Sequence, residues 1–286
     1  DAHFQLAKIL GAKGQSEEAI NVLEKLLEQN PSHEKAQAIL LQELKAACEW
    51  EKLEKVIATN KVLTEKLISE GKVPGETPFL NITYNDELAE NYKVAKAWSD
   101  ELEKKYAPVR KSFIHTPPLQ EKKKITIGYI SADFREHAVG RVAQYIFSSH
   151  DHANFQINAY AISPDDGSEV RKRFASDADK FIDLAGLSNL NAAKKIYEDA
   201  VDILVDLTCY TAGGRMEIAA LKPAPIQINM WGFAASTGAD FMDYIIADEI
   251  VIPEQDRKFY SEKPIYLPQS FLVTHKNETI SDKKFK

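Results

Sequence analysis

The second half of the sequence alternates short apolar runs with amphipathic stretches, and this pattern restricts the fold more than any other feature. After Lys124, runs such as ITIGYIS, FQINAYAIS and VDILVDL are separated by stretches with a helical spacing of apolar residues, such as AVGRVAQYIFSSH and NAAKKIYEDA, which are predicted helices. Short apolar runs that alternate with helices imply right-handed βαβ units and a parallel sheet. We therefore predict a Rossmann-like, doubly wound α/β lobe over residues 119–286.

Polar or glycine-rich segments follow several of the predicted strands. In a doubly wound sheet the ligand crevice lies at the carboxyl ends of the strands. These segments therefore predict a site at that edge of the sheet. They are SADFREHAVG, SPDDGSE, TCYTAGGR and WGFAASTGADF.

Residues 1–70 have the pattern of a helical repeat. The stretch AHFQLAKILGAKGQSEEAINVLEKLLEQNP reads as a helix, a glycine turn, a second helix and a proline. Ala7 and Ala19 fall at the small positions of the tetratricopeptide pattern, and Gly14 provides the turn. A second, less regular helix pair follows. We predict tetratricopeptide-type (TPR) repeats here, with a plain helical bundle as the alternative.

Residues 71–118 are predicted to be a connector. GKVPGETPF is a predicted loop, and DELAENYKVAKAWSDELEKKYA is a predicted helix. The Pro-rich and then basic run HTPPLQEKKK marks the expected domain boundary. Repeats of this type depend on stacked neighbours, and the chain begins with Asp1 rather than Met. We therefore expect it to be a fragment of a longer protein.

Composition excludes several classes of protein. The chain has 286 residues, of which 44% are hydrophobic and 28% charged, and its formal net charge is −7. An acidic balance argues against nucleic-acid binding through phosphates. No apolar run approaches the roughly 20 residues that span a bilayer, and no signal peptide opens the chain. The two cysteines, Cys48 and Cys209, indicate reduced thiols, so we expect a cytoplasmic protein without membrane contact.

The segment after the first predicted strand contains the strongest single candidate for chemistry. His137 can accept a proton from a hydroxyl or donate to a sugar or phosphate, and the alternative is a surface histidine near a helix end. Asp133 is predicted to cap the following helix. Glu136 near a helix start is favoured by the helix dipole, which is a structural role.

The glycine-containing loops after later strands offer backbone and side-chain donors. Gly213 and Gly214 let the backbone approach a ligand, and Arg215 can reach an anion or a carbonyl; a simple loop is the alternative. Gly232 and Gly238 offer amides for an anion or serve packing. Neither a G-x-G-x-x-G fingerprint nor a Walker motif is present, so no dinucleotide or ATP is predicted.

Three other residues are weaker candidates. His150 and His152 have metal-like spacing but lack a companion cluster in the sequence, so we expect no metal site. Cys209 has no identifiable base nearby and is predicted to be a bystander thiol. We read SPDDG as a structural turn.

Taken in order, these motifs resemble a known family. The TPR array is followed by IGYISADFREH, ILVDLTCYTAGGR, LKPAPIQINMWGFAASTG and FMDYIIAD. This arrangement resembles the protein O-GlcNAc transferases and their bacterial and plant SPINDLY-type relatives. The resemblance implies inverting transfer of N-acetylglucosamine from UDP-GlcNAc to protein Ser/Thr hydroxyls, without a metal or other cofactor. It also implies a GT-B fold of two Rossmann-like lobes, of which this chain holds the first.

The resemblance also implies site residues. In the family's Asp-Phe-x-x-His segment the histidine lies beside the sugar and acceptor and is one candidate base, with the donor phosphate as the rival. Here Asp133 would orient the segment and Gly232 would offer a backbone donor near the sugar phosphate. The TPR helices would present protein or peptide acceptors. The matching positions are Asp133, Phe134 and His137, then Tyr210, Thr211, Gly213 and Arg215, then Trp231, Gly232 and Phe233.

The sequence also departs from the family. Ala138-Val139 replaces Pro-Thr of the animal enzymes, Thr208-Cys209 stands where Asn-Gly is common, and Ala234 replaces a proline. The animal enzymes' histidine-rich segment before the catalytic region has no counterpart in GETPFLNIT. The family's second lobe, which supplies the UDP pocket and a lysine, would follow Lys286. We therefore expect the chain alone to be inactive.

Two other functions stay open at this stage. The SPINDLY relatives use GDP-fucose, and donor choice depends largely on the second lobe. A non-catalytic module that binds peptides through its TPR helices is the alternative from another class.

Overall fold

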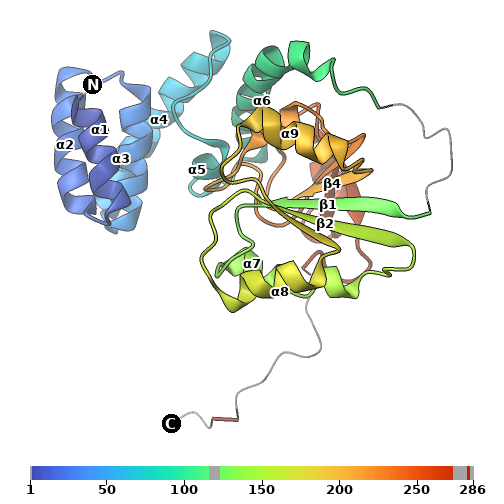
Figure 1. The fold of residues 1–286 in the computed structure, drawn as a ribbon. Helices are drawn as coiled ribbons and strands as arrows, with labels where there is room; N and C mark the ends of the chain where they lie inside the picture. The colour runs from blue at the N-terminus through green and yellow to red at the C-terminus, as the bar shows by residue number, and fades with distance from the viewer. Residues whose placement is uncertain (1, 116–122, 273–281, 284–286) are drawn as a thin grey trace. The chain divides into compact units, whose positions relative to one another are not determined.

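The chain forms two compact units. The computed structural model describes residues 2–115, 123–272 and 282–283 (Figure 1). The predicted boundary between residues 118 and 119 lies outside these ranges. The first unit comprises Asp1–Pro108, Ala235–Asp240 and Lys258–Glu262. The second unit comprises Val109–Ala234, Phe241–Arg257 and Lys263–Lys286.

The first unit is helical. Successive helices among the first four pack against each other, and Ala7 and Ala19 are fully buried where small side chains were predicted. Gly14 turns the chain with a φ of 74°, a value that glycine adopts without strain. The helices are α1 (Ala2–Ala12), α2 (Ser16–Gln29), α3 (Glu34–Ala46), α4 (Trp50–Ser69), α5 (Pro78–Ile82) and α6 (Leu88–Arg110).

The short helix α5 corrects the predicted loop GKVPGETPF at its end. Thr77 is the N-cap, and its side chain accepts a hydrogen bond from the Leu80 amide at 3.1 Å. Pro78 occupies the first helical position, where a missing N–H costs nothing. The threonine and proline together therefore start a helix in a stretch that otherwise reads as a loop.

The second unit contains a seven-stranded sheet in which every pair of neighbours is parallel, as predicted. The strand order is β3-β2-β1-β4-β5-β6-β7. The order reverses between β1 and β4, and a doubly wound sheet binds ligands at such a switch point. The strands are β1 (Ile125–Ser131), β2 (Phe155–Ala161), β3 (Lys180–Asp183), β4 (Ile203–Asp206), β5 (Ile226–Asn229), β6 (Tyr244–Ala247) and β7 (Lys263–Tyr266).

Helices flank this sheet. In Figure 1, α7 and α8 lie on one side of β1 and β2, and α9 lies on the other. The helical elements are α7 (Ala138–Ala143), α8 (Glu169–Asp177), α9 (Asn189–Glu198) and α10 (Met216–Ala220), with 3-10 turns η1 (Phe147–Ser149) and η2 (Glu254–Phe259).

The predicted helix over AVGRVAQYIFSSH is wrong in its length. Only α7 is α-helical, and the chain then turns into η1. Phe147, at the start of η1, is fully buried and packs against Phe134 and Phe174. The α-helix thus ends four residues before this buried ring.

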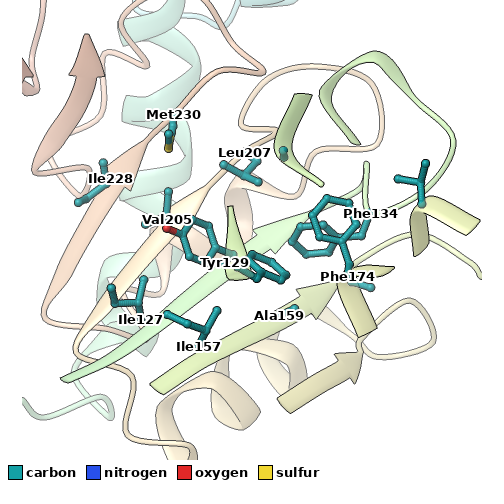
Figure 2. Close-up of a cluster of buried hydrophobic side chains, with 14 residues drawn as sticks. Ile127, Tyr129, Phe134, Ile157, Ala159, Phe174, Val205, Leu207, Ile228 and Met230 are labelled. Atoms are coloured by element: carbon teal, nitrogen blue, oxygen red, sulfur yellow. The ribbon is translucent and has the colours of Figure 1, made fainter. Parts of the chain in front are cut away.

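The core beneath the strand ends anchors the segment after β1. Figure 2 shows Phe134 beside Phe174, with ring centroids 4.7 Å apart. Phe134 is only 1% exposed although it lies within the polar run SADFREH. Burial of this ring holds the residues on either side of it at the edge of the sheet.

Candidate active site

The segment after β1 and the loop after β4 are hydrogen-bonded to each other at the switch point. The Ala132 amide donates to Oγ1 of Thr208 at 2.9 Å, and the hydroxyls of Ser131 and Thr208 are 3.2 Å apart. The Asp133 amide donates to Oγ of Ser131 at 2.9 Å. All of these groups are buried, so the position of the segment is fixed by contacts shielded from water.

Asp133 and His137 form a pair at this edge. Nδ1 of His137 lies 3.3 Å from Oδ1 of Asp133, and a guanidinium nitrogen of Arg135 lies 3.5 Å from the same oxygen. The Asp133 side chain is 2% exposed and that of His137 is 40% exposed. A buried carboxylate therefore lies behind a histidine that solvent or a substrate can reach.

The predicted helix cap is wrong in its residue. His137, not Asp133, is the N-cap of α7, and its Nδ1 accepts from the Val139 amide at 3.3 Å. Oδ1 of Asp133 is buried and accepts no hydrogen bond from the described residues. Burial raises the pKa of the Asp133 carboxyl, while His137 and then Arg135 lower it.

The two contacts of His137 Nδ1 correspond to different states of the ring. A lone pair on Nδ1 accepts from Val139, which puts the proton of a neutral ring on Nε2. A proton on Nδ1 points instead to Asp133 and leaves Nε2 free to accept. Only the second state makes the exposed face of the ring a base.

Glu136 and the SPDDG turn have structural contacts, as predicted. Glu136 pairs with Arg141, and its amide donates to Oδ2 of Asp166 at 2.9 Å. That backbone hydrogen bond, with those from Ser168, lowers the pKa of Asp166 to about 2. Ser168 caps α8 through its hydroxyl. The turn follows β2, and its hydrogen bond to the Glu136 amide fixes the segment just before His137.

The loop after β4 is held by a second buried carboxylate. Oδ1 of Asp206 accepts from the amides of Thr208 and Cys209, each at 2.8 Å. Burial raises the pKa of the Asp206 carboxyl; the two amides oppose this effect and the nearby charge of Asp133 adds to it. Cys209 is 1% exposed, and its thiol lies 3.3 Å from Oδ1 of Asn229.

The Tyr210–Arg215 loop borders the same edge. The Tyr210 ring packs edge-on against Phe233 with centroids 5.5 Å apart, and the Thr211 hydroxyl donates to the Thr208 carbonyl at 2.8 Å. A Cβ placed on Gly213 would lie 3.1 Å from that of Ala132. The loop therefore adjoins the segment that carries His137.

The predicted ligand donor Arg215 is bound to the protein. Its guanidinium donates to Oδ1 of Asn189 at 2.7 Å and to the carbonyls of Leu184 and Leu187 at 3.1 and 2.7 Å. These two carbonyls lie in the loop between β3 and α9, so the guanidinium binds the protein itself and not a ligand.

The turn after β5 is tightly packed. Trp231 has a φ of 68°, and its ring nitrogen donates to the Phe271 carbonyl at 2.8 Å. The predicted donor, the Gly232 amide, donates to the Met230 carbonyl at 3.0 Å. Phe233 is 2% exposed, so its side chain is a core group. The groups of this turn are therefore used in packing and in hydrogen bonds within the protein.

Contacts thus bring the sequence-predicted residues to the ends of β1, β4 and β5. Thr208 and Asp206 were missed as site-building groups. The sequence contains a signal for both, because they are polar residues at the end of the apolar run VDILVDL. In the sequence, Thr208 is distinguished only as a departure from the family's Asn-Gly.

The histidines with metal-like spacing lie elsewhere, in the connection before β2. Nε2 of His150 lies 2.9 Å from the Tyr129 hydroxyl, and Nδ1 of His152 lies 3.1 Å from Asp179. Within the described residues, no three His, Cys, Asp or Glu side chains are grouped so as to hold a metal ion. No helix in the described part of the chain is long and apolar enough to cross a membrane.

Two families match the sequence. Glycosyl transferase family 41 matches residues 47–286, and the tetratricopeptide repeat family matches residues 1–33. A probable UDP-N-acetylglucosamine–peptide N-acetylglucosaminyltransferase SEC from Arabidopsis thaliana is 33% identical over 260 residues, which cover 85% of this chain and 26% of that protein.

Other relatives agree with these matches. A UDP-N-acetylglucosamine–peptide N-acetylglucosaminyltransferase from Caenorhabditis elegans is 31% identical over 232 residues, which cover 79% of this chain and 20% of that protein. A solved O-GlcNAc transferase variant from Thermobaculum terrenum has a TM-score of 0.54 and 18% identity, and covers 95% of this chain and 57% of that one. This last likeness supports the fold alone.

Proposed function

Because the chain belongs to glycosyl transferase family 41, we propose that it forms part of a protein O-glycosyltransferase that moves N-acetylglucosamine from UDP-GlcNAc to serine or threonine hydroxyls. The names of its matched relatives support this donor and this acceptor class. The chain spans about a quarter of the length of the Arabidopsis relative. The proposal therefore assigns it the acceptor side of a site that a second lobe completes.

The pairing of Asp133 with His137 at the β1/β4 switch point is the observation that carries the proposal. An acceptor hydroxyl attacks C1 of the sugar, the bond from C1 to the phosphate oxygen breaks, and UDP leaves with the bonding electrons. The hydroxyl proton passes to Nε2 of His137 when Nδ1–H donates to Asp133. Asp133 then stabilises the imidazolium, so it acts as a positioning residue.

We further propose that the reaction needs no metal and that charge on the leaving phosphate is met by donors outside this chain. Such charge requires preorganised cationic or amide donors. The Gly232 amide and the Arg215 guanidinium are both bound to protein carbonyls. The 286-residue chain is therefore expected to be inactive alone.

The TPR helices are proposed to hold protein acceptors, and the protein is proposed to be cytoplasmic. Cys48 is exposed and Cys209 is buried, and both are free thiols. Free thiols are typical of a reducing compartment.

The test compares this 286-residue chain with a chain extended to the natural stop codon. Each is given UDP-GlcNAc or GDP-fucose and an acceptor protein. We expect sugar transfer only by the extended chain and only from UDP-GlcNAc. Transfer from GDP-fucose alone would overturn the donor assignment. No transfer from either donor, with peptide binding retained, would make the protein a recognition module.

A further inference from the structure

The first unit contains a pocket that the glycosyl-transfer site does not use. Its volume is about 260 Å³, and it is lined by α4, the following loop, α5 and α6. Ile68 and Val94 contribute apolar surface to it, and Thr64, Glu76 and Asn81 contribute polar groups. All of these residues belong to the first unit.

A buried carboxylate lies at the polar side of this pocket. Glu76 is 1% exposed. Its Oε1 accepts from the Thr64 hydroxyl at 2.6 Å, and its Oε2 accepts from the Tyr84 hydroxyl at 2.6 Å and from Nδ2 of Asn81 at 3.2 Å. Burial and the charge of Glu76 raise the pKa of the Tyr84 phenol, so Tyr84 remains a donor.

These contacts determine the orientation of the Asn81 amide. Its nitrogen donates to Glu76 and to the Tyr84 hydroxyl, which is 3.2 Å away. A flipped amide would direct its oxygen at the carboxylate. Oδ1 of Asn81 therefore points away from this network, and it accepts no hydrogen bond from the described residues. Asn81 is 2% exposed, so this is a buried, unused acceptor in a residue that lines the pocket.

The charged residues around the pocket also favour a ligand that donates hydrogen bonds over an anionic one. Glu65, Glu76 and Glu90 line it together with Lys61 and Lys93. Nζ of Lys61 lies 3.4 Å from Glu90. Glu76 and Asn81 both line the pocket and both carry acceptor oxygens, so an anionic head placed against them would meet acceptors. A ligand head with only N–H donors fits this arrangement.

We propose that this pocket binds a small primary ammonium ligand, with its short aliphatic chain against Ile68 and Val94. The ammonium donates to Oδ1 of Asn81, and the carboxylates of Glu65, Glu76 and Glu90 that line the pocket attract its charge. This inference does not rest on the proposed glycosyltransferase activity. It would stand if that activity were disproved.

The test titrates the chain with butylammonium chloride and follows the Asn81 side-chain amide by NMR. Sodium butyrate and 1-butanol are the comparison probes. We expect saturable shifts with butylammonium, none with butyrate and at least about tenfold weaker binding of butanol, because the alcohol brings one donor in place of three. Equal effects of the three probes, or no saturable shift, would overturn the proposal.

Two variants tie the binding to this pocket. Asn81→Leu removes the unused acceptor, and Ile68→Phe fills the cavity while leaving the Glu76 network intact. Val62→Phe is the matched control, since Val62 lies on the same helix, is 65% exposed and does not line the pocket. Binding read by saturation-transfer NMR should be lost in Ile68→Phe and retained in Val62→Phe. Retained binding in Ile68→Phe would contradict the assignment, whether or not Asn81→Leu folds.

Discussion

At the scale of single residues, the site depends on two buried carboxyls that lie near each other. Asp133 and Asp206 are 2% and 4% exposed, and burial raises the pKa of both. Each is also held by specific contacts, Asp133 to His137 and Asp206 to two backbone amides. Asp133 therefore positions His137, whereas Asp206 holds the loop after β4. Substitution of each residue should have a different effect.

Asp133→Asn should lower kcat of the extended enzyme by roughly 10- to 100-fold, because a neutral amide stabilises the imidazolium poorly. KM should change little, and the free energy of unfolding should not fall, because the substitution removes a buried charge. Steady-state kinetics and urea unfolding on the same preparation measure all three. Equal losses of stability and activity would mean that Asp133 is only a structural residue.

Asp206→Asn should change how stability depends on pH. The folded protein raises the Asp206 pKa above its ordinary 3.8, so this carboxyl favours the folded state most below that value. The contribution is lost as pH rises through the raised folded value. An asparagine oxygen can still accept from Thr208 and Cys209 without this loss.

Urea unfolding at pH 4.5 and pH 7.5 is the measurement. The stability lost between these two pH values should be smaller in Asp206→Asn than in the unchanged chain. Asp86→Asn, at an exposed aspartate, is the control and should leave the loss as it is. An identical loss in Asp206→Asn would show that Asp206 is not the responsible group.

At the scale of elements, the sequence pattern and the structure agree where periodicity is strong. The alternation after Lys124 predicted a parallel sheet, and the observed sheet is parallel throughout. The early end of α7 could not be predicted, because the buried residues Ala143 and Phe147 keep a helical spacing across it. The start of α5 depends on the pair Thr77 and Pro78, whose local signal is short.

The location of the site could be predicted from the sequence, but most of its hydrogen bonds could not. Strand-end segments converge by topology, so His137 and the Tyr210 loop could be expected at one edge. Hydrogen bonds between segments far apart in sequence could not be expected, such as that from Ala132 to Thr208. Likewise, no pattern in the sequence revealed that the Gly232 amide is used within its own turn.

The turn after β5 gives a prediction at this scale. A Cβ on Gly232 would lie 2.1 Å from the Leu207 carbonyl oxygen, and that oxygen is part of the backbone. Gly232→Ala should therefore destabilise the chain by about 1–3 kcal/mol. Gly186→Ala is the matched control, since a Cβ there has no neighbour within 4 Å. Urea unfolding should separate the two, and equal stabilities would refute the close approach.

At the scale of the whole molecule, the chain combines a helical repeat unit with a Rossmann-like lobe of glycosyl transferase family 41. The family resemblance inferred from the motifs is confirmed by these matches. The chain covers about a quarter of the length of the Arabidopsis relative. In the proposed function, Asp133 and His137 would serve the acceptor side of the reaction.

Glycosyl transfer by the extended protein with His137→Ala tests this account most directly. His152→Ala is the control, because that histidine lies before β2 and is bonded to Asp179 and the Phe147 carbonyl. The transfer rate from UDP-GlcNAc to an acceptor protein should fall by about 100-fold or more in His137→Ala and stay near that of the unchanged protein in His152→Ala. Equal rates in the unchanged protein and His137→Ala would contradict the central role given to the Asp133–His137 pair.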